Sequence, residues 1–239
     1  MAKGVAGGSQ IPLNLSFQPE HRFESFVVPV SSTALAVVEH ALSQPSLTLL
    51  QGLSDSGKTH LLLAACHAAR QAQRRISYLP LQQEPLRRVD ALTAAQDSQL
   101  IAVDDLDSLA GDLDAQVALF HLLNHARASG ATVILAGRAS PSDMGLQLPD
   151  LVSRLNSAVR VPLQVLDDEG RKLALRKRAL SRGLEFDDAA MDWLLARADR
   201  KLSVLMSLFR QLDHASSVRQ KRLTLPFVRE TLADTLPKR

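Results

Sequence analysis

The sequence contains a single cysteine, few aromatic residues and no long apolar run. Cys66 has no second cysteine with which to form an internal disulfide, so we expect a protein of a reducing compartment. No apolar run approaches the roughly 18 residues that span a bilayer. Residues 1–10 also lack an apolar run of the signal-peptide type. We therefore expect a cytoplasmic protein with no membrane partner.

Net charge is small as well: 28 Lys and Arg stand against 25 Asp and Glu, which gives +3. A dedicated nucleic-acid-binding protein usually shows a concentrated basic patch, so this balance permits contact with DNA but does not argue for it. Hydrophobic residues at 46% and charged residues at 22% are typical of a globular chain and exclude wholesale disorder. With aromatics at 4%, the core must consist mostly of Leu, Val, Ile and Ala.

Short apolar segments alternate with helical patterns from about residue 47 to residue 163. This alternation predicts an α/β domain with a parallel sheet covered on both faces. The predicted strands are 47–50, 76–79, 100–103, 132–135 and 158–163, and the clearest helices between them are 61–72 and 114–128. Beyond residue 166 only helical patterns follow, at 167–182, 187–197 and 202–219.

These patterns divide the chain into three parts. We expect a flexible leader over residues 1–16, an α/β domain over 17–166 and a small all-helical domain over 167–239. Asp167 and Asp187 are plausible N-caps for the first two of the C-terminal helices, and Gly183 is a plausible stop for the first.

The segment from Gly52 to Thr59 matches the P-loop pattern at every fixed position, and it lies between a predicted strand and a predicted helix. The glycines let backbone N–H groups turn toward an anion, and the helix N-terminus adds partial positive charge. Lys58 would reach the β- and γ-phosphates, while the Thr59 hydroxyl would bind Mg²⁺. The predicted nucleotide-binding residues of this loop are Gly52, Ser54, Asp55, Ser56, Gly57, Lys58 and Thr59.

Asp104 and Asp105 close the third predicted strand. Asp104 suits the acidic residue that holds Mg²⁺ in P-loop proteins, together with Thr59, and Asp105 would occupy the position of a water-activating base. The alternative is that Asp104, Asp105 and Asp107 only cap the next helix. The P-loop upstream favours the Mg²⁺ interpretation.

A P-loop, an acidic strand end and a helical C-terminal domain together resemble the AAA+ ATPases, and within them the DnaA branch. Three further stretches carry the resemblance over almost the whole chain: Gln10–Leu15, Leu148–Leu155 and Leu223–Val228. The resemblance implies a five-stranded parallel sheet, a helical lid beyond about residue 167 and bound ADP or ATP. It also implies work through head-to-tail contacts, as a homodimer or homo-oligomer.

Residues 23–28 resemble the opening of the AAA+ module in this family, where backbone receives the adenine. The resemblance thus places Phe26 and Val27 at the base of the nucleotide. Full-length DnaA carries a helix-turn-helix domain after the lid, whereas this chain ends about where the lid ends. We therefore expect no origin-recognition domain, as in the regulatory inactivators of this family.

In the family, an arginine in the segment matching residues 149–155 acts in trans on the nucleotide of a neighbouring AAA+ protein. That residue is Arg154 here, and the resemblance makes it the catalytic arginine finger for DnaA-bound ATP. A guanidinium suits the task because it is permanently charged and donates in a planar fork. From composition alone, a surface ion pair or a helix C-terminal charge is the favoured interpretation.

The segment Gln10-Ile11-Pro12-Leu13-Asn14-Leu15 resembles the peptide that docks bacterial proteins on the sliding clamp, the β subunit of DNA polymerase III. Gln10 would enter a polar subsite, and Leu13 and Leu15 a hydrophobic pocket. The alternative is a first strand that packs on the AAA+ core. The resemblance implies a negative regulator, an inhibitor of DNA replication initiation, with DnaA and the clamp as partners.

Two positions depart from the family pattern. Arg138 stands where members place an acidic sensor 1, and Ser203 stands where they place the arginine of sensor 2. Arg200 and Lys201 are alternatives for that arginine, although a one-residue offset turns a helical side chain by about 100°. Both departures predict weak ATP hydrolysis by this chain alone, with nucleotide binding retained. The alternatives are a helicase-loader-type ATPase that hydrolyses its own ATP, and a DNA-binding module that uses the basic residues 171–172 and 176–178 of the lid for weak DNA contact.

Overall fold

The computed structural model describes residues 21–28, 32–83, 85–219 and 222–235. The predicted clamp-binding peptide at residues 10–15 lies outside this range. Among the described residues, no helix is both long and apolar enough to cross a membrane.

The centre of the N-terminal domain is a five-stranded parallel sheet in the order β2-β3-β4-β1-β5. This confirms the predicted fold class. The strands are β1 (Leu47–Gln51), β2 (Ile76–Pro80), β3 (Leu100–Asp104), β4 (Thr132–Gly137) and β5 (Val159–Pro162). Because β4 lies between β1 and β3, the loop after β1 and the acidic end of β3 flank the end of β4 at one edge of the sheet. Parallel sheets bind ligands at this carboxyl edge.

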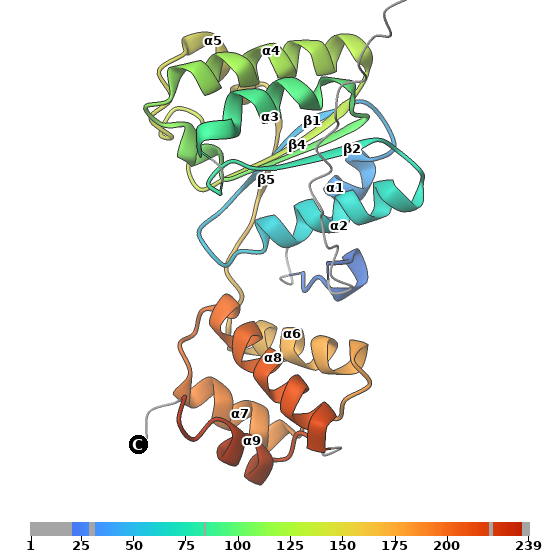
Figure 1. Cartoon of the computed structure of the whole chain (residues 1–239), viewed down its shortest axis with the longest axis vertical. Helices are drawn as coiled ribbons and strands as arrows, with labels where there is room; N and C mark the ends of the chain where they lie inside the picture. The colour runs from blue at the N-terminus through green and yellow to red at the C-terminus, as the bar shows by residue number, and fades with distance from the viewer. Residues whose placement is uncertain (1–20, 29–31, 84, 220–221, 236–239) are drawn as a thin grey trace, which may run out of the picture.

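Helices cover both faces of the sheet (Figure 1). One face carries α1 (Ala34–Ala41) and α2 (Lys58–Gln71), and the other carries α3 (Arg88–Ala94), α4 (Leu113–Ser129) and α5 (Pro149–Asn156). Successive strand residues enter opposite cores, so Leu49 packs on the α4 side and Leu50 on the α2 side. Short 3-10 helices complete the domain: η1 (Phe23–Ser25), η2 (Pro85–Arg87), η3 (Ala95–Asp97) and η4 (Leu106–Leu109).

The C-terminal helices form a second body with its own core, around the fully buried Phe209. They are α6 (Asp168–Ser181), α7 (Asp188–Arg197), α8 (Leu202–Arg219) and α9 (Leu225–Thr231). The Asp167 side chain caps α6 by accepting from the Gly170 amide at 2.8 Å, and Gly183 follows this helix with a φ of +67°. Asp187 occupies the N-cap position of α7, but its side chain makes no capping hydrogen bond.

Candidate nucleotide-binding site

The loop between β1 and α2 has backbone conformations and close contacts that require glycine. Gly57 has a φ of +90°, and a Cβ atom there would lie 2.7 Å from Cε2 of Phe26. A Cβ atom on Gly52 would lie 2.4 Å from the Leu163 carbonyl oxygen. The loop therefore packs tightly against Phe26 and Leu163, and neither glycine position has room for a side chain. This is the shape that a phosphate-binding loop needs.

Lys58, the first residue of α2, turns back into this loop. Its Nζ donates to the carbonyl oxygens of Gly52 and Leu53, each at 2.7 Å. Burial lowers the pKa of the ammonium, while the negative charge of Asp104 opposes that shift. The loop thus holds a cation beside its own carbonyls, where an anionic phosphate would be a better partner.

The predicted Mg²⁺ residues lie together at the ends of α2 and β3. Thr59 Oγ1 donates to Asp104 Oδ2 at 2.6 Å, and the Tyr78 hydroxyl donates to the same oxygen at 3.2 Å. Asp104 is almost fully buried. Burial of the Tyr78 hydroxyl, and then the negative charge of Asp104, raise the pKa of Tyr78. A hydroxyl and a carboxylate brought together in this way fit the oxygen ligands that Mg²⁺ takes in nucleotide sites.

The neighbouring acidic residues have different roles. Asp105 has a φ of +59° and precedes η4, but its side chain makes no capping hydrogen bond. Burial and the adjacent Asp104 raise the pKa of Asp105, the direction that suits a general base. Asp107 accepts from the backbone amides of Arg138 at 2.7 Å and Ala139 at 3.3 Å. Asp107 therefore secures the turn after β4, and none of the three carboxylates caps η4.

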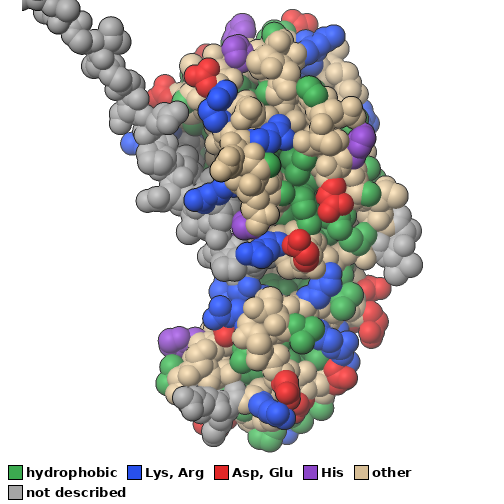
Figure 2. Space-filling model, turned by 90° about the vertical axis from the view of Figure 1, so that its right-hand side faces the viewer, with side chains coloured by type: hydrophobic (Ala, Val, Ile, Leu, Met, Phe, Trp, Pro, Cys, Tyr) green, Lys and Arg blue, Asp and Glu red, His purple; other side chains and the backbone are tan. Residues whose placement is uncertain are grey.

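A cavity of about 160 Å³ continues from the P-loop into the junction between the two domains. Phe26 and Val27, which the resemblance places at the base of the nucleotide, line it together with Asp55, Ser56 and Gly57 of the loop. No pattern in the sequence predicts the other lining side chains, which include His21, His60, Ala174, Arg178, Met206 and Arg210. Figure 2 shows Lys and Arg side chains on both sides of this junction.

Two histidines form part of the cavity wall. The His60 Nε2 donates to the Arg22 carbonyl oxygen at 3.1 Å, and the rings of His21 and Phe26 lie 5.4 and 5.5 Å from the His60 ring. Burial, and then the charge of His60, lower the pKa of His21 to about 4. Burial also lowers the pKa of His60. At neutral pH the part of the wall formed by His21, His60 and Phe26 is therefore uncharged and aromatic, which suits the flat face of a base.

Two contacts hold the helical domain against the nucleotide site. Lys177 on α6 donates to the carbonyl oxygens of Phe26 at 2.9 Å and Glu24 at 3.0 Å. The carboxylate of Asp55 in the P-loop accepts from the Ser203 amide at 2.9 Å, at the start of α8. An acidic side chain at a helix N-terminus is favourable because the exposed amides there carry partial positive charge. Lys177 and Asp55 thus close the helical domain over the cavity from both sides.

Residues 17–165 match the family model described as the bacterial DnaA ATPase domain. The chain belongs to the DnaA family of AAA+ proteins. Residues 168–232 match a second model, described as the Hda lid domain. Together the two matches make it an Hda-like member of the DnaA family, a DnaA-related AAA+ regulator, and the helical domain is its lid.

Solved structures agree with this assignment at the level of the fold. Domain III of the Thermotoga maritima replication initiation protein DnaA is 23% identical, with 92% of this chain and 99% of that chain covered at a TM-score of 0.74. AMPPCP-bound DnaA from Aquifex aeolicus is 24% identical. The match covers 86% of this chain and 70% of that chain, with a TM-score of 0.68. A Thermotoga maritima RuvB structure is 17% identical. The match covers 91% of this chain and 72% of that chain, with a TM-score of 0.64.

Both departures from the DnaA family pattern lie beside the nucleotide site. Arg138 is exposed at the end of β4, and its positive charge lowers the pKa of Lys58. Ser203 presents its backbone amide, rather than an arginine side chain, to the P-loop. Arg138 therefore adds a positive charge near Lys58, and Ser203 contributes a backbone amide to the P-loop.

Arg154, the predicted finger, lies in the last turn of α5 and is not among the residues that line the cavity. Its Nη2 donates to Oδ1 of Asn124 on α4 at 2.6 Å. Within the described residues its partner is thus a neutral amide and not the carboxylate of a surface ion pair. Its place in the last turn of α5 agrees with the other alternative, a charge at a helix C-terminus.

The basic residues of α6 are mostly engaged inside the lid. Arg171 pairs with Asp168, Lys172 with Asp192 at 2.7 Å, and Arg176 with Asp188. Lys177 bonds the η1 segment, as described above. These contacts weaken the alternative of a DNA-binding face on this helix.

Proposed function

We propose that this chain is a negative regulator of DNA replication initiation that acts with bound ADP or ATP. In this proposal it docks on the DNA-loaded sliding clamp through Gln10–Leu15 and presents Arg154 to ATP held by DnaA. Stimulated hydrolysis converts DnaA-ATP into DnaA-ADP, and initiation stops. The observation that carries the proposal is an Hda-type lid behind a DnaA-type ATPase domain.

The geometry of the cavity supports nucleotide binding. Phe26, Val27 and His60 would contact the base, and the P-loop with Lys58 would hold the phosphates. Thr59 and Asp104 would hold Mg²⁺, which neutralises phosphate charge in P-loop proteins. AMPPCP-bound structures are known for the related DnaA proteins. The loop's glycines and the aromatic part of the wall, formed by His21, His60 and Phe26, favour the same kind of ligand here.

The position of Arg154 supports action on a neighbouring protein. Its side chain does not line the chain's own cavity, and within the described residues it has no carboxylate partner. A guanidinium that keeps its full charge can stabilise the charge that develops on the transferred phosphoryl group. Contacts with DnaA, and between copies of this chain in a homodimer or homo-oligomer, would be head-to-tail, as in other AAA+ assemblies.

The test measures hydrolysis of ATP bound to DnaA, with the clamp loaded on DNA, as this protein is added. The proposal predicts acceleration that requires the clamp and is lost in a Leu13→Ala/Leu15→Ala variant. That variant should also lose binding to the clamp itself, while Lys58→Ala should lose nucleotide. No acceleration by a protein that still binds the clamp would contradict the proposal.

The second candidate is a helicase-loader-type ATPase that hydrolyses its own ATP. The raised pKa of Asp105 beside Asp104 favours it, because a base with a raised pKa accepts a proton more readily. A steady-state ATPase assay of this chain alone, with Lys58→Ala as the control, separates the two functions. A brisk rate that Lys58→Ala abolishes would favour the loader, and a very slow rate would favour the regulator.

A further inference from the structure

The side chain of Arg154 is held by a residue that is distant in the sequence. Arg154 ends α5, and its Nη2 donates to Oδ1 of Asn124 on α4 at 2.6 Å. Both residues are half-buried, so the bond is partly sheltered from water. The end of α5 is also fixed, because the Ser157 hydroxyl donates to the Arg154 carbonyl oxygen at 2.6 Å.

The chemistry of this partner differs from that of other arginines in the chain. Arg88 and Arg182 pair with the carboxylates of Asp112 and Asp213, at 3.0 and 2.8 Å. A carboxylate neutralises a guanidinium and would compete with a phosphate for its N–H groups. The Asn124 amide oxygen accepts this hydrogen bond but carries no net charge. Arg154 is therefore oriented while its charge remains available.

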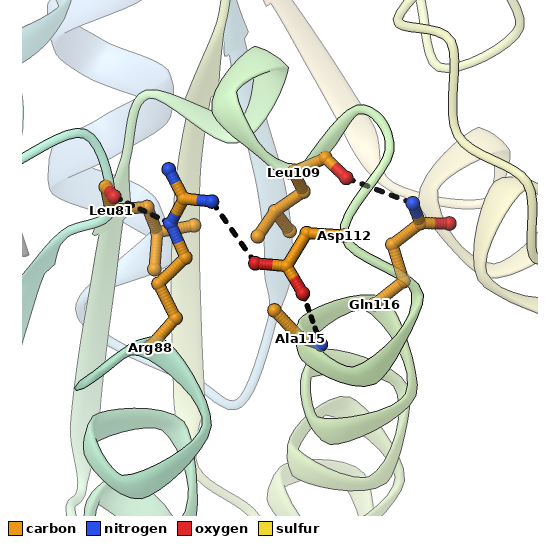
Figure 3. Close-up of polar contacts among 6 residues, drawn as sticks. All are labelled: Leu81, Arg88, Leu109, Asp112, Ala115 and Gln116. Carbon is orange, nitrogen blue, oxygen red and sulfur yellow. Dashed lines mark hydrogen bonds and ion pairs between the residues drawn. The ribbon is translucent and has the colours of Figure 1, made fainter. Parts of the chain in front are cut away.

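Helix α4 is a rigid base for this contact. The fully buried Gln116 accepts from the amide of Leu148, at the N-cap of α5, at 3.0 Å. Its Nε2 donates to the Leu109 carbonyl oxygen at 2.8 Å (Figure 3). Two residues of α4 thus fix the two ends of α5: Gln116 the backbone at its start, and Asn124 the side chain at its end.

We propose that Asn124 is a positioning residue for the arginine finger, one that orients the Arg154 guanidinium without neutralising it. This inference rests on the proposed function, since it concerns the same catalytic step. An arginine side chain has many rotamers, and ordering it into one of them costs conformational entropy. If Asn124 already holds Arg154 in the reactive rotamer, this entropy is not lost during the reaction. Asn124 touches neither substrate nor nucleotide and acts only through Arg154.

The experiment measures the rate of hydrolysis of DnaA-bound ATP against the concentration of this protein, on clamp-loaded DNA. The variants are Asn124→Ala, Asn124→Asp, Arg154→Ala and Asn156→Ala. Asn156 is the matched control, because its Oδ1 accepts from Arg160 at 2.7 Å in a second Asn–Arg pair that does not involve Arg154. Thermal unfolding of each variant checks that it folds.

We expect Asn124→Ala to lower the maximal rate by about tenfold and to leave the half-saturating concentration unchanged, since docking does not use this residue. Asn124→Asp keeps the shape and the hydrogen bond but adds a negative charge. A purely structural role would tolerate it, whereas the inference predicts a loss at least as large as that of Asn124→Ala. Asn156→Ala should match the unsubstituted protein.

The role of Arg154 and the role of Asn124 can be tested separately. If Arg154→Ala leaves the rate unchanged, both the finger and its positioning residue are refuted. If Arg154→Ala abolishes stimulation while Asn124→Ala retains the full rate, only the inference about Asn124 is overturned. The same holds if Asn124→Ala changes only the half-saturating concentration, or if Asn124→Asp retains the full rate.

Discussion

Lys177 connects the lid to the segment around Phe26 that lines the cavity. Removing this connection tests whether nucleotide binding depends on the position of the lid. Lys177→Met keeps the length and apolar stem of the side chain but removes both N–H···O bonds, to Phe26 at 2.9 Å and to Glu24 at 3.0 Å. Phe26 is buried, so leaving its carbonyl oxygen without a hydrogen-bond donor lowers the stability of the closed lid. Glu24 is exposed, so its carbonyl oxygen can accept a hydrogen bond from water instead.

A hydrogen bond from a charged donor is worth about 1.5–3 kcal/mol when it is sheltered. Lys177 is only half-buried, so we expect a total loss of about 1–2 kcal/mol. If the closed lid is the form that binds nucleotide, the dissociation constant for ADP should rise by about fivefold to thirtyfold.

The assay is a calorimetric titration of ADP into the full chain. Arg176→Met is the matched control, since Arg176 is the preceding residue of α6 and pairs with Asp188 inside the lid. The control should bind ADP as the unsubstituted protein does. An affinity of Lys177→Met within twofold of the unsubstituted protein would refute the reasoning that Lys177 holds the lid closed over the base.

Gly57→Ala should abolish ADP binding in this titration, because its Cβ would lie 2.7 Å from the Phe26 ring in a left-handed backbone conformation; normal binding would contradict the steric argument. The pKa of His21 is lowered to about 4 from its usual value near 6.5, so the unfolded chain binds more protons than the folded chain between these values. Stability should therefore fall as the pH drops through this window, and urea unfolding at pH 7 and pH 5 should show a smaller fall in His21→Gln; an equal fall would assign the effect to other groups. Phe209→Ala removes the largest fully buried side chain of the lid and should lower the free energy of unfolding by about 3–5 kcal/mol, as urea denaturation can measure; a change below about 1 kcal/mol would contradict the packing described here.

Sequence reasoning predicted the phosphate end of the site better than the base end. The P-loop with Thr59 comes after β1, and Asp104 is the last residue of β3. The parallel sheet brings the ends of these two strands to one edge. By contrast, Lys177 bonds a residue 151 positions away, and Asp55 bonds one 148 positions away. No local pattern encodes such pairs, because they depend on how the lid packs on the AAA+ domain.

Short helices were also missed for a physical reason. Helices α1 and α5 have eight residues each, and α3 and α9 have seven. Two turns give too few apolar repeats for a period of 3.6 to stand out, and tertiary packing supplies most of their stability. The family resemblance singled out Arg154 without placing it on α5, and its bond to Asn124 appears only when α5 packs against α4.

The central claim is that Arg154 acts in trans on nucleotide held by DnaA. The most direct measurement loads DnaA with radiolabelled ATP and this chain with unlabelled, non-hydrolysable AMPPCP, then follows labelled ADP on DnaA in a single turnover on clamp-loaded DNA. The account predicts rapid formation of labelled ADP with the unsubstituted chain and loss of that acceleration with Arg154→Ala, which still binds the clamp. Equal rates with Arg154 and with alanine at this position would contradict it.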